Sequence, residues 1–243
     1  MKVIILAGGG GSRLFPLSRK SYPKQFLCLE DDNSLLAHTV QRFLSFVSAK
    51  DIVVITNQKY LYHVQNELSE CNAEAAHILL EQVARNTAPA IALGAEFCRS
   101  ELDCADEEVL LVAAADHVIR PLDKFQQCVR IAERAASSGK IVTFGIPARK
   151  PETGYGYIET GKKYDHVMQV VSFKEKPDLA TAEKYVAAGN YYWNSGMFAF
   201  SLETIKRELE NWQPEIAQQM DAGYKQMLAN FADLPEISID YAV

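Results

Sequence analysis

The sequence lacks the cysteine pattern of a disulfide scaffold or a zinc cluster. Its five cysteines are an odd number, and no CxxC pair occurs among the 243 residues. Small secreted scaffolds pair an even number of cysteines, and structural zinc sites commonly use closely spaced cysteine pairs. The cysteine pattern therefore argues against both kinds of site and fits a reducing compartment.

Long apolar runs are also missing. The first apolar run, residues 3–7, is cut off by four consecutive glycines, which makes it too short for the apolar region of a signal peptide. No other stretch is long enough to span a membrane. We therefore expect a cytoplasmic protein without a membrane partner.

Positive charge is scarce in the chain as a whole but concentrated near its start. Lysine and arginine number 25 against 31 acidic residues, a net charge of −6, which argues against a nucleic-acid-binding surface. The cations that precede the first acid, Glu30, are Lys2, Arg13, Arg19, Lys20 and Lys24. A local cationic cluster in an acidic protein indicates a small anionic ligand, and a solvated basic face is the alternative.

Apolar runs alternate with amphipathic segments through the first 147 residues. Strands are expected at residues 3–6, 52–56, 77–80, 109–113 and 141–145, and helices at 35–44, 60–68, 87–98 and 125–136. Ser34 and Thr87 are the expected caps of two helices. This alternation predicts an α/β fold with a mostly parallel sheet covered on both faces. Such sheets bind ligands beyond the carboxyl ends of their strands, which places residues 7–13, residues 81–87 and Asp116 along one edge.

The second half follows a different pattern. Residues 151–160 are rich in turn formers and aromatics, and a helix closed by Gly189 is expected at 179–188. Further strands are expected at 167–173 and 197–200, followed by helices on both sides of Pro214. The final "ISIDYAV" is interpreted as a strand, and the natural chain is expected to continue. No linker composition divides the chain, so we expect one domain over residues 1–243.

The stretch "LAGGGGSRLFPLSRKSYPKQFL", residues 6–27, predicts a phosphate site. Glycine backbone N–H groups approach phosphate oxygens without side chains in the way, and Arg13 and Lys24 supply positive charge. The stretch is not a P-loop, because no Gly-Lys-Ser/Thr follows, and Arg13 stands where the dinucleotide fingerprint has its third glycine. A flexible turn after the first strand is the simpler alternative.

The same stretch resembles the signature of sugar-1-phosphate nucleotidyltransferases, and "PLSRKSYPKQFL" resembles their mannose-1-phosphate guanylyltransferase branch in particular. Further segments agree in order along the chain: "RNTAPAI", "ADHVI", "PETGYGYI", "FKEKP", "WNSGMFAF" and "SIDYAV". One departure is visible, because Gln82 and Ala84 stand where the family usually has a proline and a glycine. Arg85, Asn86 and Thr87 remain in place.

The resemblance implies a Rossmann-like three-layer nucleotidyltransferase fold, with a nucleotide-binding half at residues 1–147 and a sugar-binding portion at 148–243. It implies catalytic roles for Arg13 and Lys24. The nucleotide-binding residues that it implies are Leu6, Ala7, Gly8, Gly9, Gly10, Gly11, Ser12, Arg13, Arg85, Asn86 and Thr87.

For the metal, the resemblance implies that Asp116 and Asp240 bind Mg²⁺, a hard cation that takes few carboxylates and keeps several waters. We interpret His117 as a structural neighbour of this pair rather than as a ligand or base. The sugar-phosphate-binding residues that the resemblance implies are Gly156, Glu175, Lys176 and Asn194. As an extended stretch, "FKEKP" is expected to present Lys174 and Lys176 on one side and Glu175 on the other.

The resemblance implies the reaction of GTP with α-D-mannose 1-phosphate to give GDP-mannose and pyrophosphate, within polysaccharide biosynthesis. One alternative is a nucleotidyltransferase that uses UTP or dTTP with glucose 1-phosphate. The other is a non-catalytic sugar-nucleotide-binding regulatory subunit, against which the presence of Arg13, Lys24, Asp116 and Asp240 together argues. The expected partners are GTP and mannose 1-phosphate, and homo-oligomerisation stays open.

Overall fold

The computed structural model describes residues 1–9, 16–19, 22–29 and 31–243. Within these residues, eight strands form one sheet in the order β3-β2-β1-β4-β8-β6-β7, and β5 pairs with β8. The strands are β1 (Lys2–Leu6), β2 (Ile52–Asn57), β3 (His77–Glu81), β4 (Val109–Ala114), β5 (Val142–Pro147), β6 (Gly156–Tyr164), β7 (Val167–Glu175) and β8 (Tyr191–Ser201). The α/β fold expected from the sequence is confirmed.

The sheet has a parallel and an antiparallel part. Strands β1 to β4 pair in parallel, as the alternation of strands and helices predicts. Strand β8 then runs antiparallel to β4, β5 and β6, and β6 runs antiparallel to β7. Because the four parallel strands share one direction, their carboxyl ends meet at one edge of the sheet.

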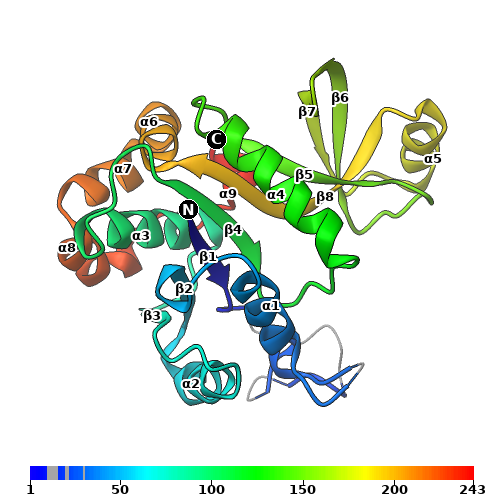
Figure 1. The fold of residues 1–243 in the computed structure, drawn as a ribbon. Helices are drawn as coiled ribbons and strands as arrows, with labels where there is room; N and C mark the ends of the chain where they lie inside the picture. Colours follow the sequence, from blue (N-terminus) through cyan, green and yellow to red (C-terminus); the bar gives the residue numbers. More distant parts are fainter. Residues whose placement is uncertain (10–15, 20–21, 30) are drawn as a thin grey trace.

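Helices cover both faces of the sheet. Their bounds are α1 (Leu35–Leu44), α2 (Leu61–Glu70), α3 (Thr87–Ser100), α4 (Leu122–Ala136), α5 (Leu179–Ala188), α6 (Leu202–Trp212), α7 (Pro214–Asp221), α8 (Tyr224–Ala229) and α9 (Ile239–Ala242). Helices α3, α6, α7 and α8 gather on one side of the strands, and α1 and α4 lie on the other (Figure 1). Among the described residues, no helix combines the length and apolar character that crossing a bilayer requires.

Two hydrophobic cores lie on the two faces of the sheet. In β1, Ile4 packs into the core that includes α3 and α6, whereas Val3 and Ile5 pack into the core that includes α1, α2 and α4. Successive side chains of a strand point to opposite faces, so a strand buried on both faces is apolar at every position. The short apolar runs of the sequence therefore become the centre of a three-layer structure.

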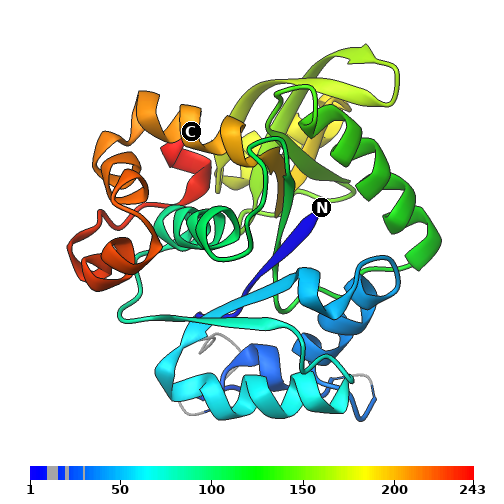
Figure 2. The same cartoon turned by 60° about the vertical axis from the view of Figure 1, so that its left-hand side comes forward.

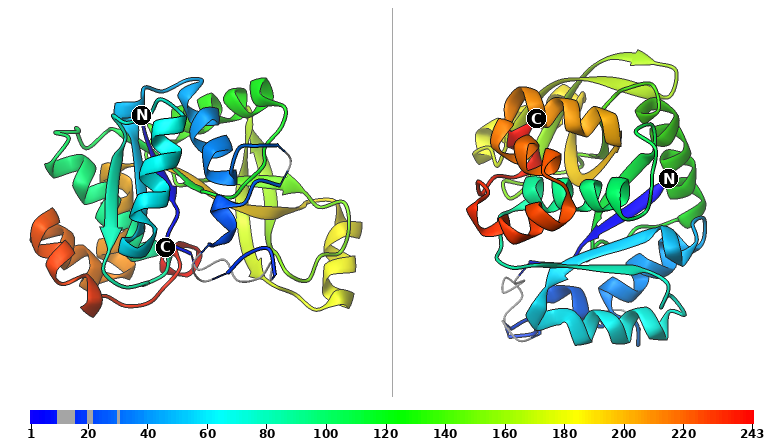
Figure 3. Two further views of the ribbon diagram at one scale, coloured as in Figure 1. Left: turned by 90° about the horizontal axis from the view of Figure 1, so that it is seen from below. Right: turned by 90° about the vertical axis from the view of Figure 1, so that its left-hand side faces the viewer.

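The antiparallel part extends to the far end of the sheet. The β6–β7 hairpin and α5 stand together at one end of the molecule, and α8 lies at the opposite end (Figures 1 and 3). Several apolar residues of β7 are exposed, including Val170 and Val171. This part contributes less to the cores than the parallel strands do.

Two expectations, the type of the C-terminal element and the cap of α3, are wrong. The C-terminal segment is the short helix α9, not a strand, and it lies beside α3 and α6 (Figure 2). The alternation of Ile237 and Ile239 suggests a strand, but Ile239 and Ala242 share the buried side of a helical turn. The cap of α3 is Asn86 rather than Thr87, since the Asn86 carboxamide accepts from the Thr87 N–H.

Candidate active site

The segments after β1 and β4 are fixed to the carboxyl edge of the parallel strands. The Ala7 N–H donates to the Ile55 carbonyl (2.7 Å), and the Ala115 N–H donates to the Leu6 carbonyl (3.1 Å). The buried Thr56 hydroxyl donates to the Ala7 carbonyl (3.1 Å). The backbone that leads into the glycine stretch therefore lies next to the backbone that leads into Asp116.

Gln25 ties the start of the glycine stretch to the short 3-10 helix η2 (Lys24–Phe26). Its buried carboxamide donates to the carbonyls of Ala7 (2.8 Å) and Gly9 (3.2 Å). Gln25 was not among the predicted site residues, although it lies beside Lys24 in the quoted motif. Its contacts fix the position of Lys24 relative to the backbone after β1.

Lys24 and Asp116 form an ion pair at this edge. The Lys24 ammonium lies 3.0 Å from one Asp116 carboxylate oxygen, and both side chains are about one-third exposed, at 36% and 29%. The His117 ring lies 4.0 Å from the other oxygen. Burial, together with the charges of Arg42 and Lys24, lowers the pKa of His117 below its usual value despite the nearby Asp116 carboxylate. The structure thus brings together a cation and a carboxylate that the sequence analysis assigned to different roles.

Glu81 is a buried carboxylate at the same edge. It ends β3, and a side chain added at Gly8 would lie only 2.7 Å from its Oε1 atom, so a larger residue there would displace the Glu81 carboxylate. Burial raises the pKa of Glu81 to about 7. Among the residues that the structure describes, none donates a hydrogen bond to this carboxylate. Sequence reasoning placed Glu81 on the ligand edge but did not name it as a site residue; the signal was an acid directly after a buried strand.

The base-side residues contact the C-terminal part of the chain. The Arg85 guanidinium donates to the Ala232 carbonyl. Asn86 adopts a positive φ of 65° and caps α3. The Thr87 hydroxyl accepts from the Ile239 N–H (2.8 Å). These contacts join α3 to α9, and the nucleotide-binding role of the three residues stays a prediction.

Gly156, Glu175 and Lys176 lie together where β6 pairs with β7. A side chain at Gly156 would meet the Glu175 carboxylate and the Phe173 ring, each at 2.7 Å. The Lys176 ammonium lies 2.5 Å from the Glu175 carboxylate. The expectation that Lys176 and Glu175 face opposite sides is therefore wrong. Strand β7 ends at Glu175, and Lys176 has a positive φ of 42° that turns the chain.

Asn194, in β8, holds Asp240. Its amide nitrogen donates to the Asp240 carboxylate (2.7 Å), and its oxygen accepts from the Gly196 N–H (3.1 Å) and the Thr143 hydroxyl (3.1 Å). Burial and the nearby Glu175 carboxylate raise the pKa of Asp240, while the Asn194 bond and Lys176 oppose the rise. Asp240 therefore belongs to the same cluster as the predicted sugar-binding residues.

The chemistry of Asp116 and Asp240 is compatible with a metal that is bound together with substrate, and their metal-binding role stays a prediction. Among the described residues, no group of three or more histidine, cysteine or acidic side chains is arranged to hold a metal ion. Asp116 and Asp240 offer carboxylate oxygens, which are hard donors of the kind that Mg²⁺ prefers. The fit is chemical and partial, because phosphate oxygens and water must complete the coordination.

The structure describes only some of the predicted nucleotide-binding residues of the glycine stretch. Gly10, Gly11, Ser12 and Arg13 lie outside the described residues. Leu6, Ala7, Gly8 and Gly9 lie at the carboxyl edge of β1, as the bonds above establish.

Comparison with known proteins gives concordant results. The family model described as nucleotidyl transferase matches residues 2–234. The chain is 45% identical to a mannose-1-phosphate guanylyltransferase of Escherichia coli (strain K12), over 99% of this chain and 53% of that protein. It is 44% identical to the alginate biosynthesis protein AlgA of Pseudomonas aeruginosa, over 99% and 52%.

A solved structure also resembles the chain closely. It is named mannose-1-phosphate geranyltransferase, from Thermus thermophilus, and aligns with a TM-score of 0.90 at 32% identity, covering 100% of this chain and 70% of that one. The chain spans about half the length of the curated relatives that it matches. On the family match and this structural likeness, the chain belongs to the nucleotidyl transferase family.

Proposed function

We propose that this chain transfers GMP from GTP to α-D-mannose 1-phosphate, giving GDP-mannose and pyrophosphate. The names of the relatives support the sugar and the reaction class. The alginate and xanthan biosynthesis relatives support a place for the product in polysaccharide biosynthesis. We further propose that the chain acts as one cytoplasmic unit, with residues 1–147 serving the nucleotide and residues 148–243 the sugar.

The buried carboxylate of Glu81 is the observation that carries the choice of guanine. Guanine presents two adjacent donors, N1–H and the exocyclic amine, which a single carboxylate accepts in charge-assisted bonds. Uracil and thymine present one N–H between two carbonyl oxygens, and those oxygens repel a carboxylate. Glu81 therefore favours GTP over the alternative substrates UTP and dTTP.

The transfer itself needs little covalent chemistry from the protein. An oxygen of the sugar phosphate attacks the α-phosphorus of GTP, the new P–O bond forms, and the bond to the β-phosphate oxygen breaks in line. The attacking oxygen is already ionised, so no protein nucleophile is required. Positioning and charge neutralisation supply the rate enhancement.

Lys24 and Asp116 have complementary roles, Lys24 as a cation at the phosphates and Asp116 as a ligand of the metal. Lys24 neutralises the charge that builds on the phosphates, and the N–H groups of the glycine stretch, with Arg13, hold the triphosphate. Asp116 and Asp240 would hold Mg²⁺, which supplies further charge neutralisation at the phosphates when it is bound. The Lys24–Asp116 contact at 3.0 Å supports a common location for these roles.

On the sugar side, the cluster around Asp240 provides the contacts. Glu175 accepts from sugar hydroxyls, Lys176 contacts the sugar phosphate, and the backbone at Gly156 approaches the sugar closely. Asn194 offers a carboxamide to the sugar and orients Asp240. The proximity of Glu175, Lys176 and Asp240 supports this arrangement.

Product identification tests the proposal. The intact chain is incubated with GTP, mannose 1-phosphate and MgCl₂, and the products are followed by ³¹P NMR. GDP-mannose and pyrophosphate should appear in equal amounts. Free GMP would indicate hydrolysis and contradict transfer to the sugar. Binding of GTP without turnover would favour the non-catalytic alternative.

A further inference from the structure

Helix α1 holds the backbone on both sides of Asp116. The Thr39 hydroxyl donates to the Ala115 carbonyl (3.2 Å), and the Arg42 guanidinium donates to the His117 carbonyl (2.8 Å). A second nitrogen of Arg42 donates to the Thr39 hydroxyl (2.7 Å), which joins the two contacts into one network. The carbonyls before and after Asp116 are thus fixed to the same helix.

The charge of Arg42 is unusual for its surroundings. Arg42 is only 7% exposed, and among the described residues it forms no ion pair with a carboxylate. Burial lowers its pKa to about 10, so it remains charged near neutral pH. The rings of Phe43 and Phe125 lie 5.6 and 5.7 Å from the guanidinium carbon and provide cation–π contacts. An apolar side chain would fill this helix position without the cost of burying a charge.

We propose that Arg42 and Thr39 are positioning residues for the reaction, which act by fixing the backbone that carries Asp116. The inference rests on the proposed function. A guanidinium presents several N–H groups in one fixed plane, so it bonds the carbonyl and the hydroxyl in a set geometry, whereas an aliphatic side chain has no donor and the three donors of an ammonium rotate. The buried charge is retained because its geometry sets where the Asp116 carboxylate meets Lys24.

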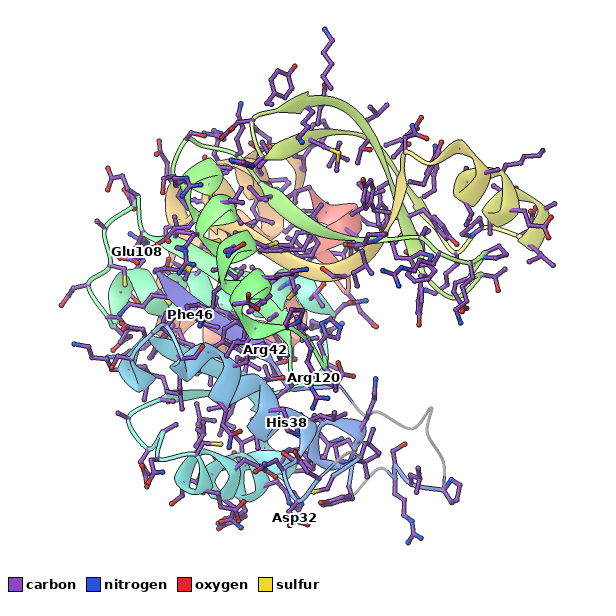
Figure 4. The ribbon with its side chains drawn as sticks, turned by 45° about the vertical axis from the view of Figure 1, so that its right-hand side comes forward. Asp32, His38, Arg42, Phe46, Glu108 and Arg120 are labelled. Carbon is purple, nitrogen blue, oxygen red and sulfur yellow. The ribbon has the colours of Figure 1, made fainter. Side chains whose placement is uncertain are left out.

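A cavity of about 260 Å³ lies on the outer side of this network. It is lined by His38, Gln41 and Arg42 of α1 and by residues 118–120 and Leu122. His38 and Arg42 lie beside the segment that carries Arg120 (Figure 4). Shortening Arg42 enlarges this cavity, so a small planar cation from solution has a path to the vacated position.

Paired variants separate geometry from packing. Arg42→Met keeps the aliphatic bulk but removes the planar donors, and Thr39→Val keeps the shape but removes the hydroxyl, whereas Thr39→Ser keeps the hydroxyl. We expect Arg42→Met to lower kcat roughly tenfold or more, with KM for mannose 1-phosphate nearly unchanged, because displacement of a reacting group costs rate rather than binding. Thr39→Val should lose more kcat than Thr39→Ser. Gln41→Ala, which lines the same cavity without contacting either carbonyl, should retain wild-type kcat.

Chemical rescue distinguishes positioning from stability. In Arg42→Ala, millimolar guanidinium chloride should restore part of the lost kcat, while sodium chloride at equal ionic strength should not, and the wild type should gain nothing. Loss of activity that follows only the loss of folded protein, without rescue, would overturn the proposal. If Arg42→Ala does not fold, the comparison of Thr39→Val with Thr39→Ser decides in its place.

A readout without turnover keeps the inference separate from the proposed function. Amide hydrogen exchange should accelerate at residues 115–118 in Arg42→Met, while exchange in β1 and α3 stays as in the wild type. Unchanged exchange at residues 115–118 would overturn the inference even if the enzyme is active. If the wild type does not turn over GTP with mannose 1-phosphate, the proposed function fails, and the exchange result still decides whether the network holds the Asp116 segment.

Discussion

The two ends of the candidate site are built in different ways. At the proposed nucleotide end, Glu81 is the last residue of β3 and Asp116 follows β4, and a backbone bond of Ala115 fixes the segment beside Asp116. At the sugar end, Asp240 and Glu175 are held by side chains, through Asn194 and Lys176 respectively. Glu175 is also held by strand pairing with Gly156, so the two ends differ mainly at Asp240, which depends on a side-chain bond to Asn194.

Burial separates the parallel strands from the outer part of β7. Ile4 and Val54, in parallel strands, are fully buried, whereas Val170 and Val171, in β7, are 47% and 57% exposed. Elements with few buried contacts open more readily than core strands. We therefore expect substitutions at the proposed charge-neutralising groups, Lys24 and the two aspartates, to act mainly on kcat, and a substitution at Glu175 to act mainly on KM for the sugar phosphate.

The largest effect is expected at the Lys24–Asp116 pair. Lys24→Ala and Asp116→Asn should each lower kcat by roughly a hundredfold or more, since several kcal/mol of charge stabilisation is lost. The thermal midpoint should change little, because a partly exposed ion pair contributes little stability. Steady-state kinetics measures kcat, and thermal denaturation measures the midpoint. Asp51→Asn, which breaks the Lys2–Asp51 pair away from the site, is the matched control. Near-normal turnover in Lys24→Ala would show that Lys24 has no part in the mechanism.

A double substitution tests whether Asp116 and Asp240 act on the same metal ion. Asp240→Asn should lower kcat about as much as Asp116→Asn, and the variant with both changes should be little worse than either, because the two carboxylates act on one ion as a unit. The kinetics should be measured over a range of Mg²⁺ concentrations. Effects that multiply would show that the two aspartates act independently and would contradict a shared metal.

A smaller effect is expected from Glu81→Gln. Loss of a charged acceptor for guanine should lower kcat/KM for GTP roughly tenfold to a hundredfold. The measurement is kcat/KM for GTP and UTP, with Glu70→Gln, an exposed acid on α2, as the charge control. Equal losses for GTP and UTP would show that Glu81 does not read the base.

The same variant tests the pKa of Glu81. Its pKa is raised from 4.5 to about 7 in the folded protein, so the folded state holds the proton more tightly. Stability from this group is present below pH 4.5 and is lost as pH rises through 7, a loss of roughly 3 kcal/mol. Glu81→Gln should therefore raise the thermal midpoint more at pH 8 than at pH 5. An equal shift at both values would show that the pKa is not raised.

The smallest effect is expected at Glu175. Glu175→Gln should raise KM for mannose 1-phosphate roughly fivefold, the value of about one hydrogen bond, with kcat and KM for GTP nearly unchanged. Lys174→Ala, one residue earlier on the exposed strand, is the control. If kcat falls instead and KM does not move, the division of labour between the two ends is wrong.

The parallel half could be predicted because its signals are local. Ser34 caps α1 as expected, with its hydroxyl accepting from the Ala37 N–H. Short apolar runs predict buried strands, and their carboxyl ends define the ligand edge before any contact is known. Asp116 is placed there by sequence alone.

The remainder depends on contacts between distant residues. Ile239 becomes helical because the start of α9 bonds to Thr87, 152 residues away, and no local pattern carries that information. Arg42 reads as an ordinary surface cation of an amphipathic helix, yet it is buried against the segment after β4. Nothing in the spacing of Asp116 and Asp240 places them together; only the resemblance to the family does so.

The central proposal is that the nucleotide end selects GTP by its guanine base, while the sugar end selects mannose 1-phosphate. Its most direct test is pyrophosphate release by the intact chain, measured as kcat/KM for GTP, UTP, dTTP and ATP, each paired with mannose 1-phosphate and with glucose 1-phosphate. The account predicts the highest value for GTP with mannose 1-phosphate. A preference for UTP or dTTP with glucose 1-phosphate would contradict it, even though the fold and the reaction class would stand.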